Sequence, residues 1–220
     1  MGLKLLITGT TGMVGEGVLR HCLNDPGVDQ VLSVSRKPCG VSHPKLTELL
    51  VPDFQQLAAV EPQLTGYDAC FYCAGISSVG LDEAAYTKIT YDTPLHFASV
   101  LARLNPKMVL VHVSGRSTDG TEKGQMMWAR VKGRAENALI KLPFRGVYNM
   151  RPALMKPVAG QKHVKAVFKP VLWFYPLWKA LFPGSSMTLD EVGQAMLACV
   201  LRGAPKQVLE VADMQALVRA

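Results

Sequence analysis

Several features that would identify other classes of protein are missing from this sequence. The 220 residues contain no uninterrupted run of about 18 apolar side chains, so we expect no membrane-spanning helix. The N-terminal stretch MGLKLLITGT runs directly into a strand-like segment and lacks the pattern of a cleavable signal peptide. Leu6 stands where a myristoylation motif requires serine or threonine, which argues against that lipid anchor.

Cysteine is also scarce, with five residues in the chain. An odd number of cysteines without a secretory signal indicates a reducing setting, and we predict a cytoplasmic protein. Cys70 and Cys73 form a CxxC pattern, but in a buried strand residues three apart point to opposite faces. Inert core thiols are therefore favoured over a redox pair or a zinc site, and no metal site is predicted.

Acidic residues become rare in the second half of the chain. The net charge is +7 overall, −2 over residues 1–110 and +9 over residues 111–220, and twelve Lys or Arg face one acid, Glu136, between Lys123 and Lys179. This asymmetry suggests an anionic partner such as phosphate or an acidic membrane surface, whereas the plain alternative is a solvated basic surface. Nucleic acid is not expected as a partner, because no nucleic-acid-binding motif accompanies the charge.

What the sequence does contain is an alternation of apolar runs and helix-like segments. Continuous apolar runs, typical of strands buried on both faces, occur at Leu3–Thr8, Val31–Ser35, Ala69–Cys73, Met108–Val113, Gly146–Met150 and Val208–Val211. The helix-like segments between them are Met13–Asn24, Asp82–Leu104 with a kink at Pro94, Trp128–Lys141, and Asp190–Leu201 with Thr188 and Glu191 as a capping box. The pattern predicts one α/β domain over residues 1–220 with a doubly wound, mostly parallel sheet.

One region breaks this alternation. Five prolines fall between Pro152 and Pro183, and we predict a lid insertion over residues 152–187 at the carboxyl end of the sheet. Within it, His163–Phe182 holds six aromatic residues, three lysines and no acid. Such a segment fits a membrane interface or a partner-binding surface, but an aromatic lid over an apolar substrate pocket is favoured.

The clearest motif is glycine-rich and lies between the first strand and the first helix. Gly9 would permit a tight turn, Gly12 would let a pyrophosphate approach the backbone, and Gly15 would allow close packing of helix on strand. The free N–H groups at the helix N-terminus would bind the phosphates, although a glycine-rich turn without a ligand is the alternative. The predicted phosphate loop comprises Gly9, Thr10, Thr11, Gly12, Met13, Val14 and Gly15.

The residues after the second strand indicate which dinucleotide would bind. An acidic residue there would accept hydrogen bonds from a free ribose 2′-hydroxyl, but this chain has Ser35, Arg36 and Lys37. Two cations and a hydroxyl suit a 2′-phosphate, so NADP(H) is predicted in preference to NAD(H). The alternative is that these are solvated loop cations.

These and four further motifs occur in the order found in one superfamily. TGTTGMVG, YCAG at residues 72–75, VSGRS with Ser114, WARVKG and RPALM with Arg151 resemble the short-chain dehydrogenase/reductases, specifically their extended, atypical and epimerase-like members. More narrowly, nearly the whole chain resembles the Tat-interacting-protein subgroup and its bacterial oxidoreductase-like relatives. The resemblance implies a Rossmann fold that binds a nicotinamide cofactor.

The resemblance also implies roles for individual residues. Asp53 would lie near the adenine, Ala74 and Gly75 would flank the adenosine ribose, and Arg151 would belong to the cofactor site. Ser114 would occupy the place of the catalytic serine, and Lys132 would bind the nicotinamide ribose. Thr90 stands where many relatives have an asparagine of a proton relay.

Trp128 is the main departure from the family pattern, because it occupies the position of the catalytic tyrosine in YxxxK. An indole N–H donates a hydrogen bond but does not ionise usefully, so the usual proton carrier is missing. Tyr86, Tyr91 or Ser117 are alternative proton carriers. We expect an oxidoreductase or epimerase-like enzyme for an apolar substrate. The rival hypotheses are a weakly catalytic or non-catalytic cofactor-binding protein and a protein that docks on membranes or partners; an oligomer is compatible with all three.

Overall fold

A central parallel sheet organises the chain. The structure, a computed structural model, describes residues 2–164 and 175–220. The sheet has the strand order β3-β2-β1-β4-β5-β6-β9, and each neighbouring pair is parallel. Its strands are β1 (Leu3–Thr8), β2 (Val28–Ser35), β3 (Leu46–Leu50), β4 (Ala69–Tyr72), β5 (Val109–Val113), β6 (Gly146–Arg151) and β9 (Val208–Glu210). The predicted doubly wound α/β fold is confirmed.

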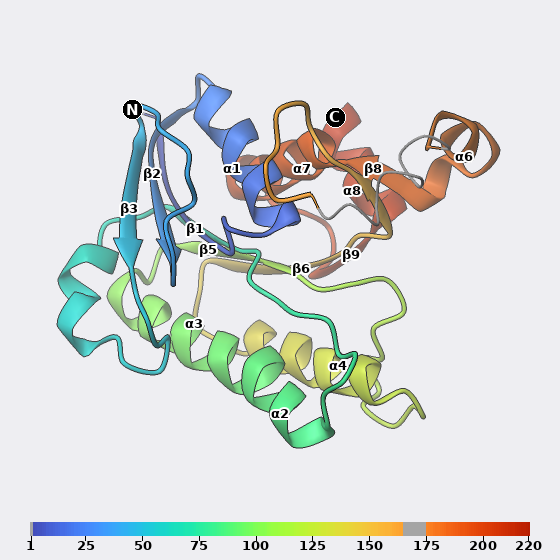
Figure 1. Cartoon of the computed structure of the whole chain (residues 1–220), viewed down its shortest axis with the longest axis horizontal. Coiled ribbons are helices and arrows are strands. Elements are labelled where there is room, and N and C mark those ends of the chain that lie inside the picture. Colours follow the sequence, from blue (N-terminus) through green and yellow to red (C-terminus); the bar gives the residue numbers. More distant parts are fainter. Residues whose placement is uncertain (1, 165–174) are drawn as a thin grey trace.

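Helices cover both faces of this sheet (Figure 1). One face carries α1 (Met13–Asn24), α7 (Leu189–Arg202) and α8 (Val211–Arg219), and the other carries α2 (Glu83–Thr87), α3 (Thr93–Leu104) and α4 (Met127–Ile140). Leu5 and Ile7 of β1 join the core on the first face, while Leu6 joins the core on the second. A strand buried on both faces needs apolar side chains at successive positions, which is why the strands read as continuous apolar runs.

Helices α1 and α7 pack very closely through two glycines. A Cβ atom added at Gly17 would lie 2.6 Å from the side chain of Leu189, and one added at Gly193 would lie 2.6 Å from that of His21. Both distances are too short for carbon atoms, so glycine is required at both positions. This close packing fixes the direction of α1, whose N-terminus points at the glycine-rich loop.

The structure corrects the prediction of one helix over Asp82–Leu104. The segment is divided into α2, a π-helical turn η2 (Lys88–Asp92) and α3, with Pro94 in the first turn of α3. Because proline has no N–H, it cannot continue the regular hydrogen-bond pattern, and the N–H of Thr93 instead bonds to the carbonyl of Lys88, five residues earlier. In place of the kink expected at Pro94, the chain forms the wide turn η2 just before this proline.

Three short strands and three short helices were not predicted. They are β3, β7 (Leu154–Lys156), β8 (Ser186–Thr188), the 3₁₀ helix η1 (Ala58–Leu64), α6 (Tyr175–Leu181) and α8. Strand β3 lies at the edge of the sheet and exposes most of its residues, so it lacks the apolar run of a central strand. The capping box of Thr188 and Glu191 at the start of α7 is confirmed.

The predicted insertion over residues 152–187 begins and ends in a second, small sheet. Strands β7 and β8 pair in parallel, and α6 and a 3₁₀ turn η4 (Pro183–Ser185) lie between them in the sequence. Residues 165–174 of the aromatic, basic segment lie outside the described part of the chain. In the described ranges 2–164 and 175–220, no helix is both long and apolar enough to cross a bilayer.

Residues 157–163, which we call the strap, are held against α1 by Glu16. The Glu16 side chain is fully buried and accepts hydrogen bonds from the backbone N–H groups of Lys162, at 2.9 Å, and His163, at 2.8 Å. Arg20 forms an ion pair with the same carboxylate at 2.9 Å. Burial raises the pKa of Glu16, but these hydrogen bonds and Arg20 outweigh it and hold the pKa below its usual value.

Candidate cofactor and active site

The glycine-rich loop adopts a conformation that only glycine allows at two of its positions. Gly9 has φ +72°, and a Cβ atom there would lie 2.6 Å from the backbone nitrogen of Ala74. A Cβ atom at Gly15 would collide with the carbonyl of Gly9. At Gly12, by contrast, the closest described atom would be the Gly9 oxygen at 3.4 Å, so one side of this backbone is open to a ligand.

The N-terminus of α1 offers hydrogen-bond donors at this open side. The Gly12 N–H bonds to the Gly9 carbonyl at 2.9 Å, and the Gly12 carbonyl accepts from the N–H of Glu16. Gly12 occupies the N-cap position, and no side chain among the described residues caps the helix there. Uncapped N–H groups at the positive end of a twelve-residue helix form a site for an anion.

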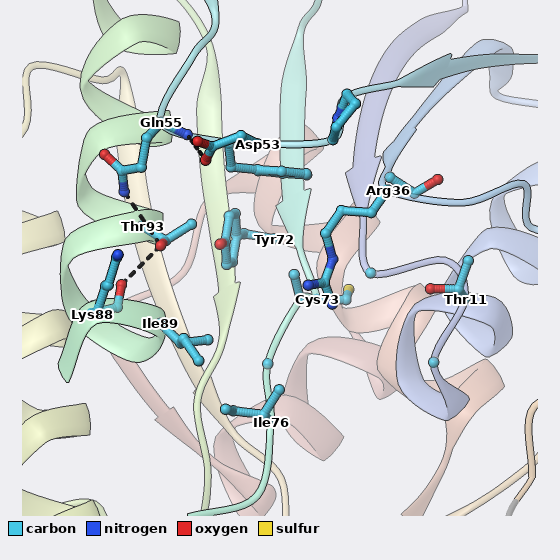
Figure 2. A pocket seen from close by; sticks show the side chains of 17 residues that line it. Thr11, Arg36, Asp53, Gln55, Tyr72, Cys73, Ile76, Lys88, Ile89 and Thr93 are labelled. Atoms are coloured by element: carbon cyan, nitrogen blue, oxygen red, sulfur yellow. Dashed lines mark hydrogen bonds between the residues drawn. The ribbon is translucent and has the colours of Figure 1, made fainter. Parts of the chain in front are cut away.

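A cavity of about 490 Å³ opens beside this loop (Figure 2). It lies where β1, β2, β3 and β4 end, at the edge where the strand order reverses between β1 and β4, which is the usual ligand position in such sheets. Predicted site residues that line it are Gly9, Thr11, Gly12, Ser35, Arg36, Asp53, Ala74 and Gly75. Residues from elsewhere in the chain complete the lining: Pro52, Phe54, Gln55, Tyr72, Cys73, Ile76, Lys88, Ile89 and Thr93.

Arg36 is an unpaired cation on the wall of this cavity. Figure 2 shows its side chain extending into the cavity from the wall opposite Lys88 and Thr93. It makes no hydrogen bond or ion pair with any residue that the structure describes. Ser35 donates its hydroxyl hydrogen to the carbonyl of Lys37 at 2.6 Å, and Lys37 itself lies outside the cavity lining.

A short chain of hydrogen bonds closes the far side of the cavity. Asp53 accepts from the backbone N–H of Gln55 at 2.9 Å, and the Gln55 side chain donates to the Thr93 hydroxyl at 3.3 Å. Thr93 in turn donates to the carbonyl of Lys88 at 2.8 Å (Figure 2). These contacts tie the segment after β3 to the start of α3, and they leave the Lys88 ammonium free of hydrogen bonds to described residues.

The two thiols of the CxxC pattern are buried groups rather than a reactive pair. Cys70 lies fully buried in β4 and Cys73 follows the strand at the cavity wall. Burial raises the pKa of Cys73 to about 12 and raises that of Cys70 as well, so both thiols stay protonated at neutral pH. All five cysteines are free.

A second group of predicted residues lies beyond this lining, where β5 ends. The Ser114 hydroxyl is 3.1 Å from that of Thr118, and Thr118 donates its own hydrogen to the Gly115 carbonyl at 2.7 Å. The Lys132 Nζ lies 4.0 Å from the position that a Cβ atom on Gly115 would take. The structure therefore brings Ser114 and Lys132 close together, as the family pattern implies.

Gly133 allows the loop after Ser114 to approach α4 this closely. A Cβ atom at Gly133 would overlap the carbonyl oxygen of Asp119. The Asp119 carboxylate orders the same loop by accepting hydrogen bonds from the N–H groups of Thr121 and Gly124. The glycine next to Lys132 thus fixes the distance between the serine-bearing loop and the helix.

Lys132 is half-buried, and its electrostatic surroundings are unusual. Burial lowers the pKa of Lys132, and the nearby carboxylate of Glu136 opposes this only in part. Both Glu136 oxygens are occupied by the guanidinium of Arg151, at 3.0 and 2.6 Å. Arg151 also pairs with Glu210 at 3.2 Å and does not line the cavity, so the structure places it in an ion-pair network rather than at the cofactor cavity.

His112 is a buried neighbour of Lys132 that the sequence did not single out. Its Nδ1 lies 2.8 Å from the amide oxygen of Asn149, and its ring centroid is 5.9 Å from that of Tyr72. Burial and the charge of Lys132 lower the pKa of His112 to about 4, so this histidine is neutral at pH 7. Its only signal in the sequence was a polar residue inside the apolar run MVLVHV.

Trp128 lies in the first turn of α4, one helical turn before Lys132 and on the same face. Tyr91 lies elsewhere: its ring packs under the guanidinium of Arg134, 4.5 Å from the centroid, on the face of α4 turned away from Lys132. Tyr86 is almost fully buried, and burial raises its pKa. Ser117 lies in the loop after β5 with φ +66°.

The remaining predicted site residues lie outside the cavity lining. Thr10 is buried and shares a 2.7 Å hydrogen bond with Ser33, while Met13, Val14 and Gly15 belong to the loop and the first turn of α1. The sequence missed Lys88, Gln55 and Thr93. None of the three belongs to a motif: Lys88 and Thr93 reach the cavity through the packing of η2 and α3, and Gln55 lies in the segment after β3.

Comparison with known proteins gives one family match and several similar proteins. The family model described as "NAD dependent epimerase/dehydratase family" matches residues 5–129. "Protein fmp52, mitochondrial" of Emericella nidulans is 26% identical over 215 residues, covering 90% of this chain and 88% of that protein. "Leucinostatins biosynthesis cluster protein T" of Purpureocillium lilacinum is 28% identical over 234 residues, covering 90% and 85%.

Similar solved structures include two Bordetella bronchiseptica enzymes. WbmG in complex with NAD has a TM-score of 0.70 at 13% identity, covering 100% of this chain and 78% of that chain. WbmF in complex with NAD+ has a TM-score of 0.68 at 17% identity, covering 99% and 77%. At these identities the likeness shows a common fold.

Proposed function

The chain belongs to the NAD dependent epimerase/dehydratase family, and we propose that it is an NADP(H)-dependent oxidoreductase or epimerase-like enzyme for a small, largely apolar substrate. The observation that carries this proposal is the unpaired Arg36 on the wall of the cavity beside the glycine-rich loop. An exposed guanidinium in a dinucleotide cavity is suited to a 2′-phosphate, because its planar fork matches the phosphate oxygens.

The residues around the cavity fit this cofactor. Gly12 and the N-terminus of α1 would bind the pyrophosphate. Because Gly9 has no side chain, the loop can pack closely against the backbone of Ala74. Asp53, Phe54 and Gly75 line the cavity, and in this proposal the first two would hold the adenine and Gly75 would lie beside the ribose. Ser114 and Lys132 would receive the nicotinamide end, where the bound cofactor supplies hydride chemistry.

The preference for NADP(H) over NAD(H) rests on charge. No acidic residue follows β2, where a free 2′-hydroxyl would require one. Asp53 is the one acid among the lining residues, and it accepts hydrogen bonds from Gln55 and Gln56 on the adenine side. A 2′-phosphate at Arg36 would therefore meet an unpaired cation and no carboxylate from its own strand end.

Calorimetric titration of NADPH and NADH tests the proposal. Wild-type protein should bind NADPH more tightly, and Arg36→Ala should weaken NADPH binding about 10–100-fold while changing NADH binding little, as expected for loss of a charged hydrogen bond. Lys107→Ala is the control. Lys107 lies just before β5, at the amino ends of the strands and away from the cavity, so removal of this exposed cation should change neither affinity. An unchanged NADPH:NADH ratio in Arg36→Ala contradicts the proposal.

Trp128 favours a second candidate function, a cofactor-binding protein with little or no turnover. Its indole occupies the position from which a phenol would transfer the substrate proton. Oxidation of NADPH across a panel of aldehydes, ketones and quinones separates the two functions. Turnover comparable to that of ordinary reductases excludes the non-catalytic one.

A docking role at an anionic membrane surface remains a prediction. Trp178, Leu181 and Phe182 expose 44%, 63% and 52% of their surface on and just after α6, which suits an interface between apolar and polar surroundings. The cations of this half of the chain are less available than the sequence suggests, because several are paired within the fold: Arg130 with Glu83, Arg151 with Glu136, and Lys179 with Glu191. A lid over the substrate stays the favoured role for residues 152–187.

A further inference from the structure

The ammonium group of Lys132 has no hydrogen-bond partner among the described residues, although the side chain is half-buried. Its face of α4 also carries Trp128 one turn before and Glu136 one turn after. Partial burial disfavours the cationic form and lowers the pKa of Lys132, so its proton is held less firmly than that of a surface lysine. This is the property expected of a group that exchanges a proton with a ligand.

The groups around Lys132 leave it without a free anion. From β5 it faces the neutral ring of His112, which is itself flanked by Tyr72 of β4. From its own helix it faces Glu136, but Arg151 of β6 binds both oxygens of that carboxylate. The serine-bearing loop presents the hydroxyl groups of Ser114 and Thr118 and carries Arg116 next to Gly115, so the charge that it adds is positive there.

The hydroxyl groups close to Lys132 are poor candidates for proton donors. The single proton of the Thr118 hydroxyl goes to the Gly115 carbonyl, so in the 3.1 Å contact with Ser114 it is Ser114 that donates. The Ser114 oxygen is then left as an acceptor toward a ligand. Tyr91 is held under Arg134 on the other face of the helix.

We propose that Lys132 itself exchanges the substrate proton in this protein, in the place of the absent phenol, while Ser114 accepts a hydrogen bond from the lysine or, in the direction of oxidation, from the alcohol. This inference rests on the proposed function, since it requires a nicotinamide dinucleotide as the hydride source. In the direction of reduction, a hydride reaches the carbonyl carbon and an N–H proton of Lys132 passes to the carbonyl oxygen, giving an alcohol. The Nζ is left as a neutral amine and takes a proton from solvent; oxidation runs the same transfers in reverse.

This role predicts a definite dependence on pH. The ammonium form is the reactive form for reduction, so the rate should fall as the pH rises through the lowered pKa of Lys132. The amine form is the reactive form for oxidation, so that rate should rise over the same range. A lysine with an ordinary pKa would place both changes at about pH 10.4, and Lys132 should place them at a lower pH.

Two measurements on the full chain test the proposal. In protein labelled with ¹³C-lysine, the Cε shift of Lys132, assigned by its loss in Lys132→Arg, reports the titration without any turnover. Reduction of benzaldehyde, cyclohexanone and phenanthrenequinone by NADPH is followed in wild type, in Lys132→Arg and in Lys141→Arg. Lys141→Arg is the matched control, because Lys141 is exposed at the end of the same helix.

We expect Lys132 to titrate below the other lysines, with the reduction rate following its midpoint. Lys132→Arg keeps the charge but cannot give up a proton near neutral pH, so turnover should fall about 10²–10⁴-fold while NADPH binding is retained. Ordinary titration of Lys132, wild-type turnover in Lys132→Arg, or no turnover in a wild type that binds NADPH overturns the inference. Failure of NADPH to bind overturns the proposed function instead.

Discussion

At the scale of single residues, Trp128 and Lys132 decide what chemistry is available. The two side chains share one face of α4, and Lys132 lies beside the loop that carries Ser114. The indole contributes apolar surface and a donor, whereas the amine is the group that ionises. In the function proposed above, binding of the nicotinamide end and transfer of a proton both depend on Lys132.

Trp128→Tyr should create a better proton carrier at this position. A phenol one turn from the Lys132 ammonium would have its pKa lowered by that charge, which favours transfer at neutral pH. We predict at least about a tenfold rise in carbonyl reduction by NADPH, within the range attributed to general acids. Trp128→Phe removes the indole without adding a hydroxyl, and a rise of the same size in both variants would show that the phenol is not responsible.

Sequence reasoning located the residues that follow a motif and missed those that depend on tertiary contacts. The glycines and Arg36 were found because strand, loop and helix are consecutive in the chain. His112 and Lys88 were missed because their positions depend on the packing of separate elements. Arg151 was placed at the cofactor by resemblance, whereas its ion pair with Glu136 joins β6 to α4 and leaves no trace in the spacing of the sequence.

At the scale of elements, the strap joins the predicted lid, of which it is a part, to α1. Gln161 donates to the carbonyl of Met13 at 2.7 Å, and Lys162 reaches the carbonyl of Gly40 at 3.0 Å. Together with Glu16, these contacts hold residues 157–163 over the first turn of α1. The order of the strap is therefore linked to the helix end that would bind the pyrophosphate.

Glu16→Gln should loosen the strap. Glutamine keeps one acceptor oxygen but loses the charge, and hydrogen bonds to a charged group are worth about 1.5–3 kcal/mol. We predict that hydrogen exchange at the backbone N–H groups of Lys162 and His163 becomes about 10-fold faster or more at pH 7. Glu122→Gln, in the exposed loop after β5, is the control and should leave these amides protected.

The pH dependence of the strap has a definite sign. Because the pKa of Glu16 in the folded protein lies below its usual value, its stabilising effect is complete above that usual value and is lost as the pH falls through the lowered one. The two amides should therefore remain protected at pH 5 in the wild type. Loss of protection at pH 5, or unchanged exchange in Glu16→Gln, would contradict the role of the carboxylate.

Elements with a strong apolar pattern were predicted closely, and the others were not. β1 and α1 begin and end at the predicted residues. Gly2 and Gly9 flank β1, and the glycine-rich loop leads into α1. β2 begins three residues earlier than predicted, at Val28, since Asp29 interrupts its apolar run. The prediction of one helix over residues 82–104 was wrong because η2 has only five residues. A turn that short has no hydrophobic pattern that distinguishes it from an α-helix.

At the scale of the whole molecule, the order of strands brings the motifs together. All seven strands of the described sheet run in parallel, so the residues after β1, β2, β3 and β4 meet at one edge. The predicted Rossmann fold and membership of the short-chain dehydrogenase/reductase superfamily are confirmed by this topology and by the family match over residues 5–129. The narrower resemblance to the Tat-interacting-protein subgroup and the cytoplasmic location stay predictions, and the similar Emericella nidulans protein has "mitochondrial" in its name.

The most direct test of the central claim is a crystal structure of the protein with NADPH, from which two distances are measured. We predict that the Arg36 guanidinium lies within hydrogen-bond distance of the 2′-phosphate, about 2.7–3.2 Å, with the pyrophosphate against Gly12. We also predict that the nicotinamide ends beside Lys132 and Trp128. A 2′-phosphate in solvent away from Arg36, or a nicotinamide remote from α4, would contradict the claim that this cavity is an NADP(H) site.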